Sequence, residues 1–307
     1  MAYRFIDLDQ EAFILINGPL ICLNLTTNIF YAYCLIFPPR NGPKPKQPLK
    51  ILLEILVWSS ITFCVSLSIL HRLFSDGQYF VLFMVWYIVL SFVHNSMVCS
   101  VWLNFFYYIQ IVPSQRAVLI WIKRNIRSVI YMTLLFGCAL FLFSAAGSIA
   151  HLILLTPTLV TSINDTKAEF FNFELDMASK VYFCMIKAYI LMCMCIMMIS
   201  SFSTVIYLHR HIRSMAKGSS SFSTPKIQSQ MRVTITGICQ GVLYVLFDTF
   251  NLLESFTNKF SPHYGIGVWL SFTVTSLYIS GTTVNLGIGQ AAFRQRVVNI
   301  WKKFRAL

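Results

Sequence analysis

The sequence predicts an all-α membrane protein, a bundle of seven membrane-spanning helices followed by a short amphipathic helix. Three observations predict this class. The chain of 307 residues is 57% hydrophobic and only 11% charged, so it lacks the charged surface that a soluble protein of this length needs. Seven long apolar runs alternate with six short loops. Basic residues gather in alternate loops, as the positive-inside rule describes for membrane proteins.

Each apolar run can cross a bilayer, which takes about 20 mostly apolar residues in a helix. We expect spans near 11–37, 49–73, 79–111, 127–155, 181–208, 231–255 and 265–290. The inner loops are then 38–48, 112–126 and 209–230, and the outer loops are 74–78, 156–180 and 256–264. Residues 1–290 therefore form one transmembrane domain, and residues 291–307 form a separate C-terminal element.

The C-terminal element, residues 291–307, has the pattern of an amphipathic helix. Its apolar side chains recur at helical spacing with basic residues between them: Phe293, Val297, Ile300, Trp301 and Phe304. Such a helix lies along the surface of a membrane, here the inner leaflet.

Charge fixes the orientation of the bundle. With the N-terminus outside, the inner loops with up to two flanking residues, and the tail, hold 18 of the 24 Lys and Arg residues and none of the 11 Asp and Glu residues. The positive-inside rule then places the C-terminus in the cytosol. Asn164-Asp-Thr166 is an N-glycosylation sequon in the second outer loop, the side on which glycosylation occurs.

Several function classes find no support in the sequence. The net charge of +13 lies beside the membrane, where cytosolic lipid headgroups are acidic, so we expect membrane lipids rather than nucleic acid as partners. All nine cysteines fall in the apolar runs, and Cys193 and Cys195 point to different sides of a helix. We therefore expect no disulfide, metal or cofactor. No catalytic motif of a metalloprotease, hydrolase or nucleotide-binding enzyme occurs, so the chain is not expected to be an enzyme.

Ionisable residues inside the spans are costly and need a reason. Lys187 and Asp248 lie at similar depth in the outer halves of spans 5 and 6. They could form a structural ion pair, or Asp248 could face a cavity and meet cationic or hydrogen-bonding ligands. Glu254, nearer the outer surface, could be a second acid at the cavity mouth or could simply meet water. Glu54, at the inner end of span 2, should reach water or inner-loop lysines.

Two side chains in span 3 can likewise have either a structural or a functional role. A lone His94 in mid-helix is more often a packing residue than a ligand or a relay. Trp86, two turns above it, could line a pocket or pack against a neighbouring helix.

Seven helices with short loops and an outside N-terminus indicate a G-protein-coupled receptor. An agonist in the outer cavity would favour a state whose inner face opens to a partner. The common rhodopsin-like motifs are missing, because span 3 ends FFYYIQI at 105–111 and span 7 has no N-P-x-x-Y.

Other motifs resemble those of the bitter taste receptor family (type 2 taste receptors). They are FYYIQIV at 106–112, LIWIKRNIR at 119–127, YLHRHIRSM at 207–215 followed by Gly218 and Pro225, and the N-x-F of Asn28-Ile-Phe30. Tyr244 lies where the family has a span-6 tyrosine beneath the ligand, and Asn164 matches its outer-loop sequon. This resemblance extends over the whole chain.

The chain also departs from the family at particular positions. Ser59 or Ser60 stands in place of an arginine in span 2, Val89 in place of a tryptophan in span 3 and Cys193 in place of a proline in span 5. Gln110 replaces a lysine, Thr282 and Thr283 fall in the span-7 motif, and Gln290 follows it. These departures indicate a divergent, non-mammalian member and leave the activation hinge undefined.

The resemblance implies a sensor of small, mostly apolar bitter compounds in the plasma membrane. The agonist would lie between spans 3, 5, 6 and 7, against Trp86, Val89, Phe92, Val93, Lys187, Phe247, Asp248, Asn251 and Phe272. Tyr244 would act as a switch beneath it. Tyr107, Tyr108, His211, Arg213 and Lys226 would contact a heterotrimeric G protein with gustducin or another inhibitory-class α subunit. A vomeronasal-type or other chemosensory receptor, and a membrane transporter without G-protein coupling, are the alternatives.

Overall fold

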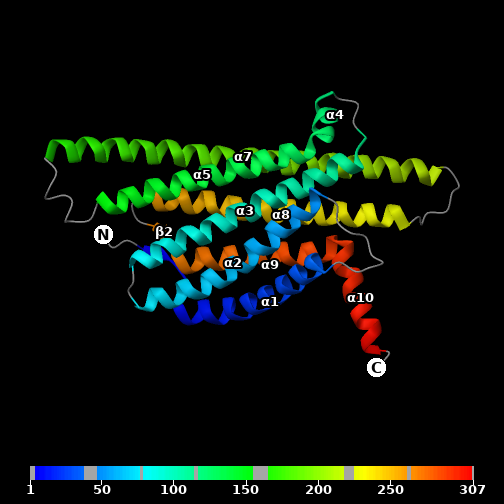
Figure 1. Ribbon diagram of the computed structural model, residues 1–307, viewed down its shortest axis with the longest axis horizontal. Helices are drawn as coiled ribbons and strands as arrows, with labels where there is room; N and C mark the ends of the chain where they lie inside the picture. The colour runs from blue at the N-terminus through cyan, green and yellow to red at the C-terminus, as the bar shows by residue number, and fades with distance from the viewer. Residues whose placement is uncertain are drawn as a thin grey trace.

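Apolar stretches form helices in this chain because a backbone in hydrocarbon must satisfy its N–H and C=O groups internally. The computed structural model describes residues 4–37, 47–76, 79–113, 117–154, 165–217, 225–260 and 264–305. The long helices lie side by side (Figure 1): α1 (Gln10–Ile36), α2 (Leu49–Asp76), α3 (Tyr79–Ile111), α5 (Ile126–Leu154), α7 (Asp165–Lys217), α8 (Pro225–Phe260) and α9 (Val268–Gly289). The shorter elements are α4 (Ala117–Arg124), α10 (Ala291–Arg305), β1 (Arg4–Ile6) and β2 (Tyr264–Ile266).

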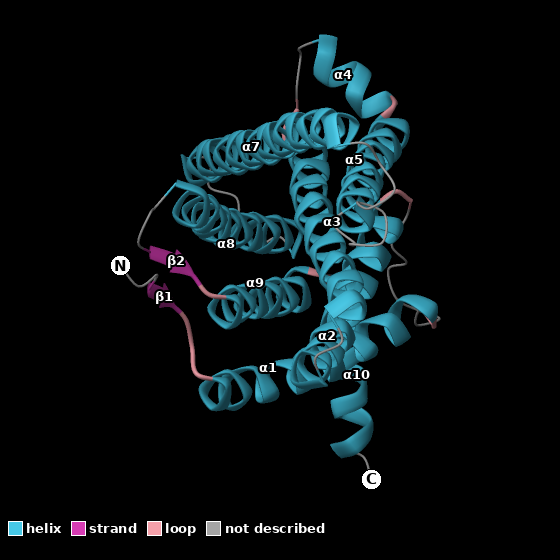
Figure 2. Cartoon of the chain, turned by 90° about the vertical axis from the view of Figure 1, so that its left-hand side faces the viewer, coloured by secondary structure: helices cyan, strands magenta, loops and turns pink. Residues whose placement is uncertain are grey.

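The seven long helices form a closed ring, and one of them also makes contacts across it. Consecutive neighbours in the ring are α1, α2, α3, α5, α7, α8 and α9, and α9 packs back against α1. Seen from one end, α7, α8, α9 and α1 follow one another along one side, with α5, α3 and α2 along the other (Figure 2). Helix α3 also contacts α7, α8 and α9, so it connects the two sides.

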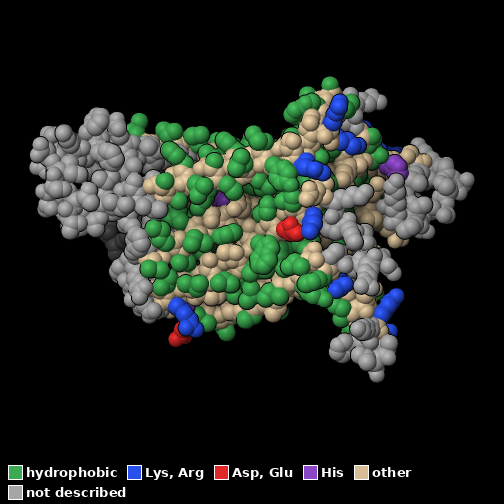
Figure 3. Space-filling view, in the orientation of Figure 1, with side chains coloured by type: hydrophobic (Ala, Val, Ile, Leu, Met, Phe, Trp, Pro, Cys, Tyr) green, Lys and Arg blue, Asp and Glu red, His purple; other side chains and the backbone are tan. Residues whose placement is uncertain are grey.

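The outer surface of the bundle is apolar. Leu15 is 78% exposed, Leu142 69% and Leu246 65%, values that suit contact with lipid better than contact with water. Hydrophobic side chains cover the middle of the visible face in Figure 3, and Lys and Arg side chains lie mostly at the end that carries α4 and α10. Within the described residues, six helices are long and apolar enough to cross a membrane: α1, α2, α3, α5, α7 and α8.

Helix α9 is not among these six, because its sequence is rich in Ser and Thr. Many of its hydroxyl side chains are buried, among them Ser271, Thr273, Ser276, Thr282 and Thr283. A polar helix of this kind is stabilised in a membrane by hydrogen bonds to its neighbours.

Three asparagines of α1 supply such hydrogen bonds. Asn17 Nδ2 donates to Thr273 Oγ1 at 2.8 Å, Asn24 Nδ2 to Ser280 Oγ at 2.6 Å, and Asn28 Nδ2 to Thr283 Oγ1 at 3.0 Å. Residue numbers rise together along both helices, with offsets of 256, 256 and 255, so α1 and α9 run parallel in nearly constant register. We call these three pairs the asparagine ladder.

The N-terminal segment is fixed to the start of α9. Strand β1 pairs in parallel with β2, and the Asp7 Oδ1 carboxylate oxygen accepts a hydrogen bond from the Leu270 backbone N–H at 2.8 Å. Gly267 occupies the N-cap position of α9 and has no side chain to cap the helix. Asp7, which is distant from α9 in the sequence, therefore caps this helix. A Cβ on Gly267 would collide with the Asp7 side chain, so this glycine permits the approach.

Several sequence-predicted boundaries were wrong. Residues 117–124 of the predicted inner loop form α4, and α7 already begins at Asp165, well inside the predicted outer loop 156–180. Helix α8 extends to Phe260, and residues 264–266 form a strand. Hydropathy locates only the part of a helix that lies in lipid, whereas polar helix formers extend these helices beyond it. Glu54 forms an ion pair with Lys50, with 3.4 Å between Oε1 and Nζ. This agrees with the expectation that Glu54 reaches basic residues at the inner end of the bundle.

The capping role of Asp7 gives a stability prediction. Asp7→Ala should lower the free energy of unfolding by about 0.5–2 kcal/mol, because the first turn of α9 loses its acceptor. A thermal denaturation midpoint in detergent, lowered by about 1–4 °C, would show this. Asp9→Ala is the matched control, since Asp9 is the N-cap of α1 and makes no side-chain capping hydrogen bond. Equal shifts for both variants would refute the capping role.

Candidate functional site

The outer half of the bundle brings together aromatic and aliphatic side chains from α3, α8 and α9. The rings of Trp86 and Phe272 meet edge to face, with centroids 5.0 Å apart. Phe247 stacks on Tyr278, with centroids 4.4 Å apart. Val89, three residues after Trp86 on α3, is also buried. The predicted pocket residues Trp86 and Phe272 are therefore neighbours in space.

Charged groups lie at the same end of the bundle. Lys187 on α7 interacts electrostatically with Asp248 and Glu254 on α8. Asp248 is only 2% exposed, and Glu254 Oε1 accepts a hydrogen bond from Ser271 Oγ at 2.6 Å. Glu254 is thus tied to α9 rather than left in water. Burying a lysine and two carboxylates inside a membrane bundle costs free energy, so their convergence makes this region the candidate ligand site.

His94 on α3 belongs to the same group. Its ring makes a hydrogen bond to the Leu90 backbone, and the imidazole interacts electrostatically with Lys187. Its Nε2 atom is buried and has no hydrogen-bond partner in the described part of the chain. We call His94, Lys187, Asp248, Glu254 and Ser271 the outer cluster.

The other predicted pocket residues occupy varied positions. Val93 is buried and Phe92 is half-buried. The Asn251 amide donates to the Phe247 carbonyl of its own helix at 3.0 Å. Asn251 thus uses one side-chain N–H donor within its own helix, and its remaining side-chain polar atoms are available to a ligand.

Tyr244 lies deeper than the outer cluster, between α8 and α7. It is 1% exposed, and its hydroxyl donates to the Ile190 carbonyl at 3.3 Å. Tyr244 therefore links the two helices about one turn inward of Phe247 and Asp248. Its role as a switch stays a prediction.

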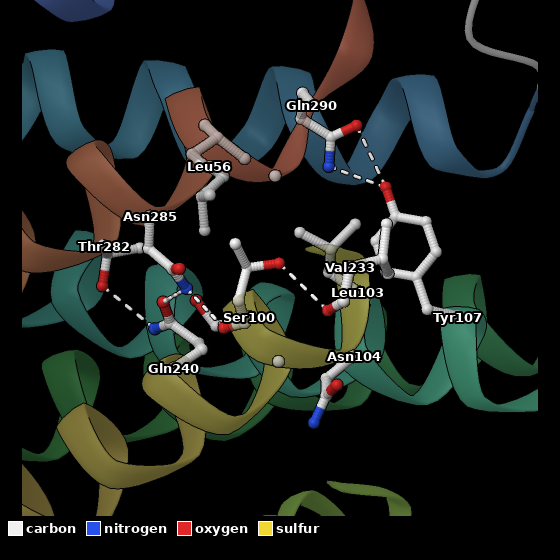
Figure 4. A pocket seen from close by; sticks show the side chains of 14 residues that line it. Leu56, Ser100, Leu103, Asn104, Tyr107, Val233, Gln240, Thr282, Asn285 and Gln290 are labelled. Carbon is white, nitrogen blue, oxygen red and sulfur yellow. Dashed lines mark hydrogen bonds between the residues drawn. The ribbon is translucent and has the colours of Figure 1, made fainter. Parts of the chain in front are cut away.

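A second polar constellation occupies the inner half (Figure 4). Gln240 Nε2 donates to Thr282 Oγ1 at 3.0 Å, and Asn285 Nδ2 donates to Gln240 Oε1 at 3.0 Å and to the Thr236 carbonyl at 2.7 Å. The Tyr107 hydroxyl pairs with the Gln290 amide, with contacts of 2.7 and 3.0 Å. We call Tyr107, Gln240, Thr282, Asn285 and Gln290 the inner network.

The inner network lines a cavity between α2, α3, α8 and α9. Its volume of about 40 Å³ suits a few water molecules, since one water needs about 10–15 Å³ by this measure. The cavity is far too small for an agonist. Water there would let the network exchange hydrogen-bond partners at low cost.

The predicted G-protein contacts are distributed over the inner ends of three helices. Tyr108 is half-buried and packs near Phe105, with centroids 5.9 Å apart. His211 is half-buried beside Tyr207, and Arg213 is exposed. The Tyr107 hydroxyl is occupied by Gln290. The side chain of Lys226, in the first turn of α8, and the whole of Asn164 lie outside the described residues.

Sequence reasoning missed the inner network and the asparagine ladder. The signal was present, because Asn17, Asn24 and Asn28 recur at intervals of seven and four residues in an apolar run. Residues at this spacing share one helix face. Their partners are Ser and Thr residues, which are only weakly polar on a hydropathy scale and so do not stand out in the sequence.

The contact between α3, α7 and α8 gives a second prediction. Asn104 Nδ2 donates to Ser201 Oγ at 2.7 Å, and a Cβ on Gly237 would lie 2.5 Å from Asn104 Oδ1. Gly237→Ala should therefore destabilise the helix bundle by about 1–3 kcal/mol through overpacking. Its thermal denaturation midpoint in detergent should fall.

Gly241→Ala is the matched control, one turn along α8. A Cβ there would make an ordinary 3.5 Å contact with Ser201 Oγ. This variant should be neutral or gain up to about 1 kcal/mol of helix propensity. If the two variants were equally stable, Asn104 would not be held as tightly as its contacts indicate.

Comparison with known families identifies the chain. Residues 49–305 match the family described as taste receptor protein (TAS2R). The match runs from the start of α2 to the end of α10, so α1 lies outside it. The comparison with curated proteins gave no match.

The match covers most of the chain and confirms the resemblance to the taste receptor family. Membership of this family implies a ligand and a G protein as partners in general, and the family is not one of enzymes. The apolar helices agree with a multi-pass membrane protein. The chain therefore belongs to the TAS2R family of taste receptors, membrane proteins of the G-protein-coupled type.

Proposed function

We propose that this taste receptor responds to small, mostly apolar bitter compounds that bind in the outer half, between α3, α7, α8 and α9. The observation that carries the proposal is the outer cluster, in which charged groups from α7 and α8 meet among apolar walls. Apolar walls with a few polar anchors are typical of sites that accept many related ligands. Trp86, Val89, Phe92, Val93, Phe247, Asn251 and Phe272 would form the walls around Lys187 and Asp248.

The proposed orientation makes α9 a seventh crossing. Several of its hydroxyl groups are hydrogen-bonded to α1 and α8, so it can cross hydrocarbon although its sequence is polar. Residues 1–290 then form the receptor domain with the N-terminus outside, and residues 291–307 lie along the cytosolic leaflet of the plasma membrane. Asn164 would be glycosylated on the outer side.

Agonist binding would be transmitted along α8. Tyr244 connects α8 to α7 below the site, and Gln240 connects α8 to α9 one turn further in. An agonist that binds better to a rearranged α8 shifts the population toward that state. The inner ends of α3, α7 and α8 would then open to a heterotrimeric G protein.

The docking surface would comprise Tyr107, Tyr108, His211, Arg213 and Lys226. The Tyr107–Gln290 pair would have to open to release Tyr107. Gustducin or another inhibitory-class α subunit fits a basic inner surface, because the acid-free inner loops complement an acidic partner.

Asp248→Asn tests the agonist site. The variant should weaken responses to cationic agonists by about tenfold or more, since a hydrogen bond to a charged group contributes about 1.5–3 kcal/mol. Responses to neutral agonists should change by less than about threefold, within the effect of a neutral hydrogen bond. The measurement is agonist-dependent nucleotide exchange on the G protein, normalised to surface expression.

Glu254→Gln is the comparison variant, since Glu254 is also bound to Ser271. Its effect on cationic agonists should be smaller than that of Asp248→Asn. Equal losses for cationic and neutral agonists in Asp248→Asn, at normal surface expression, would mean that Asp248 supports folding and does not meet the ligand.

A further inference from the structure

A groove on the lipid-facing side of the bundle lies between α1, α9 and α10. Its volume is about 650 Å³. The side chains along it include large exposed hydrophobics, with Leu23 66% exposed, Val284 60% and Val297 53%. It is separate from the outer cluster and from the cavity of the inner network, so neither the agonist site nor the switch accounts for it.

The floor of the groove is closed by internal contacts. The Asn24–Ser280 and Asn28–Thr283 hydrogen bonds of the asparagine ladder engage polar side chains of α1 and α9 with one another there. Toward the inner end, Tyr31 stacks on Phe293 with ring centroids 4.3 Å apart and an interplanar angle of 8°. What remains open to a ligand is therefore an apolar channel.

Two arginines line the inner end of this channel. Arg232 on α8 is exposed, and Arg294 on α10 is half-buried. Arg294 Nε is buried and has no hydrogen-bond partner within the described residues. By contrast, Arg296 on the same helix donates to Tyr33 Oη at 3.2 Å and lies over the Tyr33 ring.

No carboxylate of the surrounding segments can neutralise these two arginines. Residues 12–53, 225–247 and 268–305 contain no Asp or Glu. An anion from outside the chain can therefore be their partner, and a phosphate matches the planar guanidinium group in geometry as well as in charge.

We propose that this groove binds one anionic phospholipid of the cytosolic leaflet. Its phosphate lies between Arg232 and Arg294, and an acyl chain follows α1 and α9 outward. An acyl chain gains little on leaving the bilayer for this groove, because both are apolar. Selectivity must therefore come from the headgroup, so anionic lipids should be preferred to neutral ones. The assignment to the cytosolic leaflet depends on the proposed orientation, but binding to the groove does not.

Native mass spectrometry of the purified full-length receptor tests the proposal. Detergent-solubilised receptor is mixed with phosphatidylglycerol or phosphatidylcholine at equal concentration. We expect about a tenfold preference for phosphatidylglycerol, from two basic residues beside one anionic headgroup. Equal retention of both lipids would overturn the proposal. Competition by free glycerol phosphate at the same concentration would also overturn it, because a soluble anion would then suffice.

Charge variants separate this site from general basic attraction. Arg232→Gln combined with Arg294→Gln should abolish the preference. Arg124→Gln combined with Arg127→Gln is the matched control, since both residues are exposed and basic and lie on α4 and α5. The control should keep the preference. An equal loss in both double variants would show that net charge, not the groove, selects the lipid.

A steric variant tests the channel while both arginines stay in place. Val284→Trp should obstruct the groove and lower phosphatidylglycerol retention by about the same tenfold, because the acyl chain loses its place. Val284 is 60% exposed on the lipid-facing side, so the substitution should leave the fold intact, and an unchanged thermal denaturation midpoint in detergent checks this. Full retention of phosphatidylglycerol in this variant would contradict binding in the groove.

Discussion

The fold depends on the need to hydrogen-bond a polar helix inside a membrane. Helix α9 carries buried hydroxyl groups along much of its length, and in hydrocarbon each of them needs a protein partner. The asparagine ladder of α1 supplies partners on one side, and Gln240 of α8 supplies one on the other. These bonds fix the parallel register of α1 and α9. They also close the ring of helices, because α9 is the element that joins the end of the bundle to its beginning.

The same constraint connects the two functional ends. Ser271 of α9 binds Glu254 in the outer cluster, Tyr278 stacks on Phe247 in the middle, and Asn285 binds Gln240 in the inner network. Helices α8 and α9 therefore share contacts at three depths. A displacement of α8 by an agonist cannot leave the inner network unchanged, because both helices would have to repack together. Under the proposed function, these shared contacts would be the physical route from ligand to cytosolic face, without a proline hinge.

The positions of the helices could be predicted from the sequence, because apolar length and basic loops report directly on the bilayer. The resemblance placed Trp86 and Phe272 around one pocket, and in the structure their rings do meet. Hydropathy could not predict the extension of α7 to Asp165, the helix α4 or the β1–β2 pair, since these lie beyond the lipid. The inner network was missed for another reason. Thr282, Thr283 and Gln290 stand where the chain departs from the family motif, and only the structure shows that they bond to Gln240, Asn28 and Tyr107.

The central claim is that α9, despite its polar sequence, crosses the membrane and leaves the basic surface in the cytosol. The most direct test is to place epitope tags at the two termini and stain cells before and after permeabilisation. With α9 as a seventh crossing, the N-terminal tag should stain on intact cells and the C-terminal tag only after permeabilisation. Staining of both tags on one side of the membrane would mean an even number of crossings, and a C-terminal tag exposed on intact cells would reverse the orientation. Either result would contradict this account.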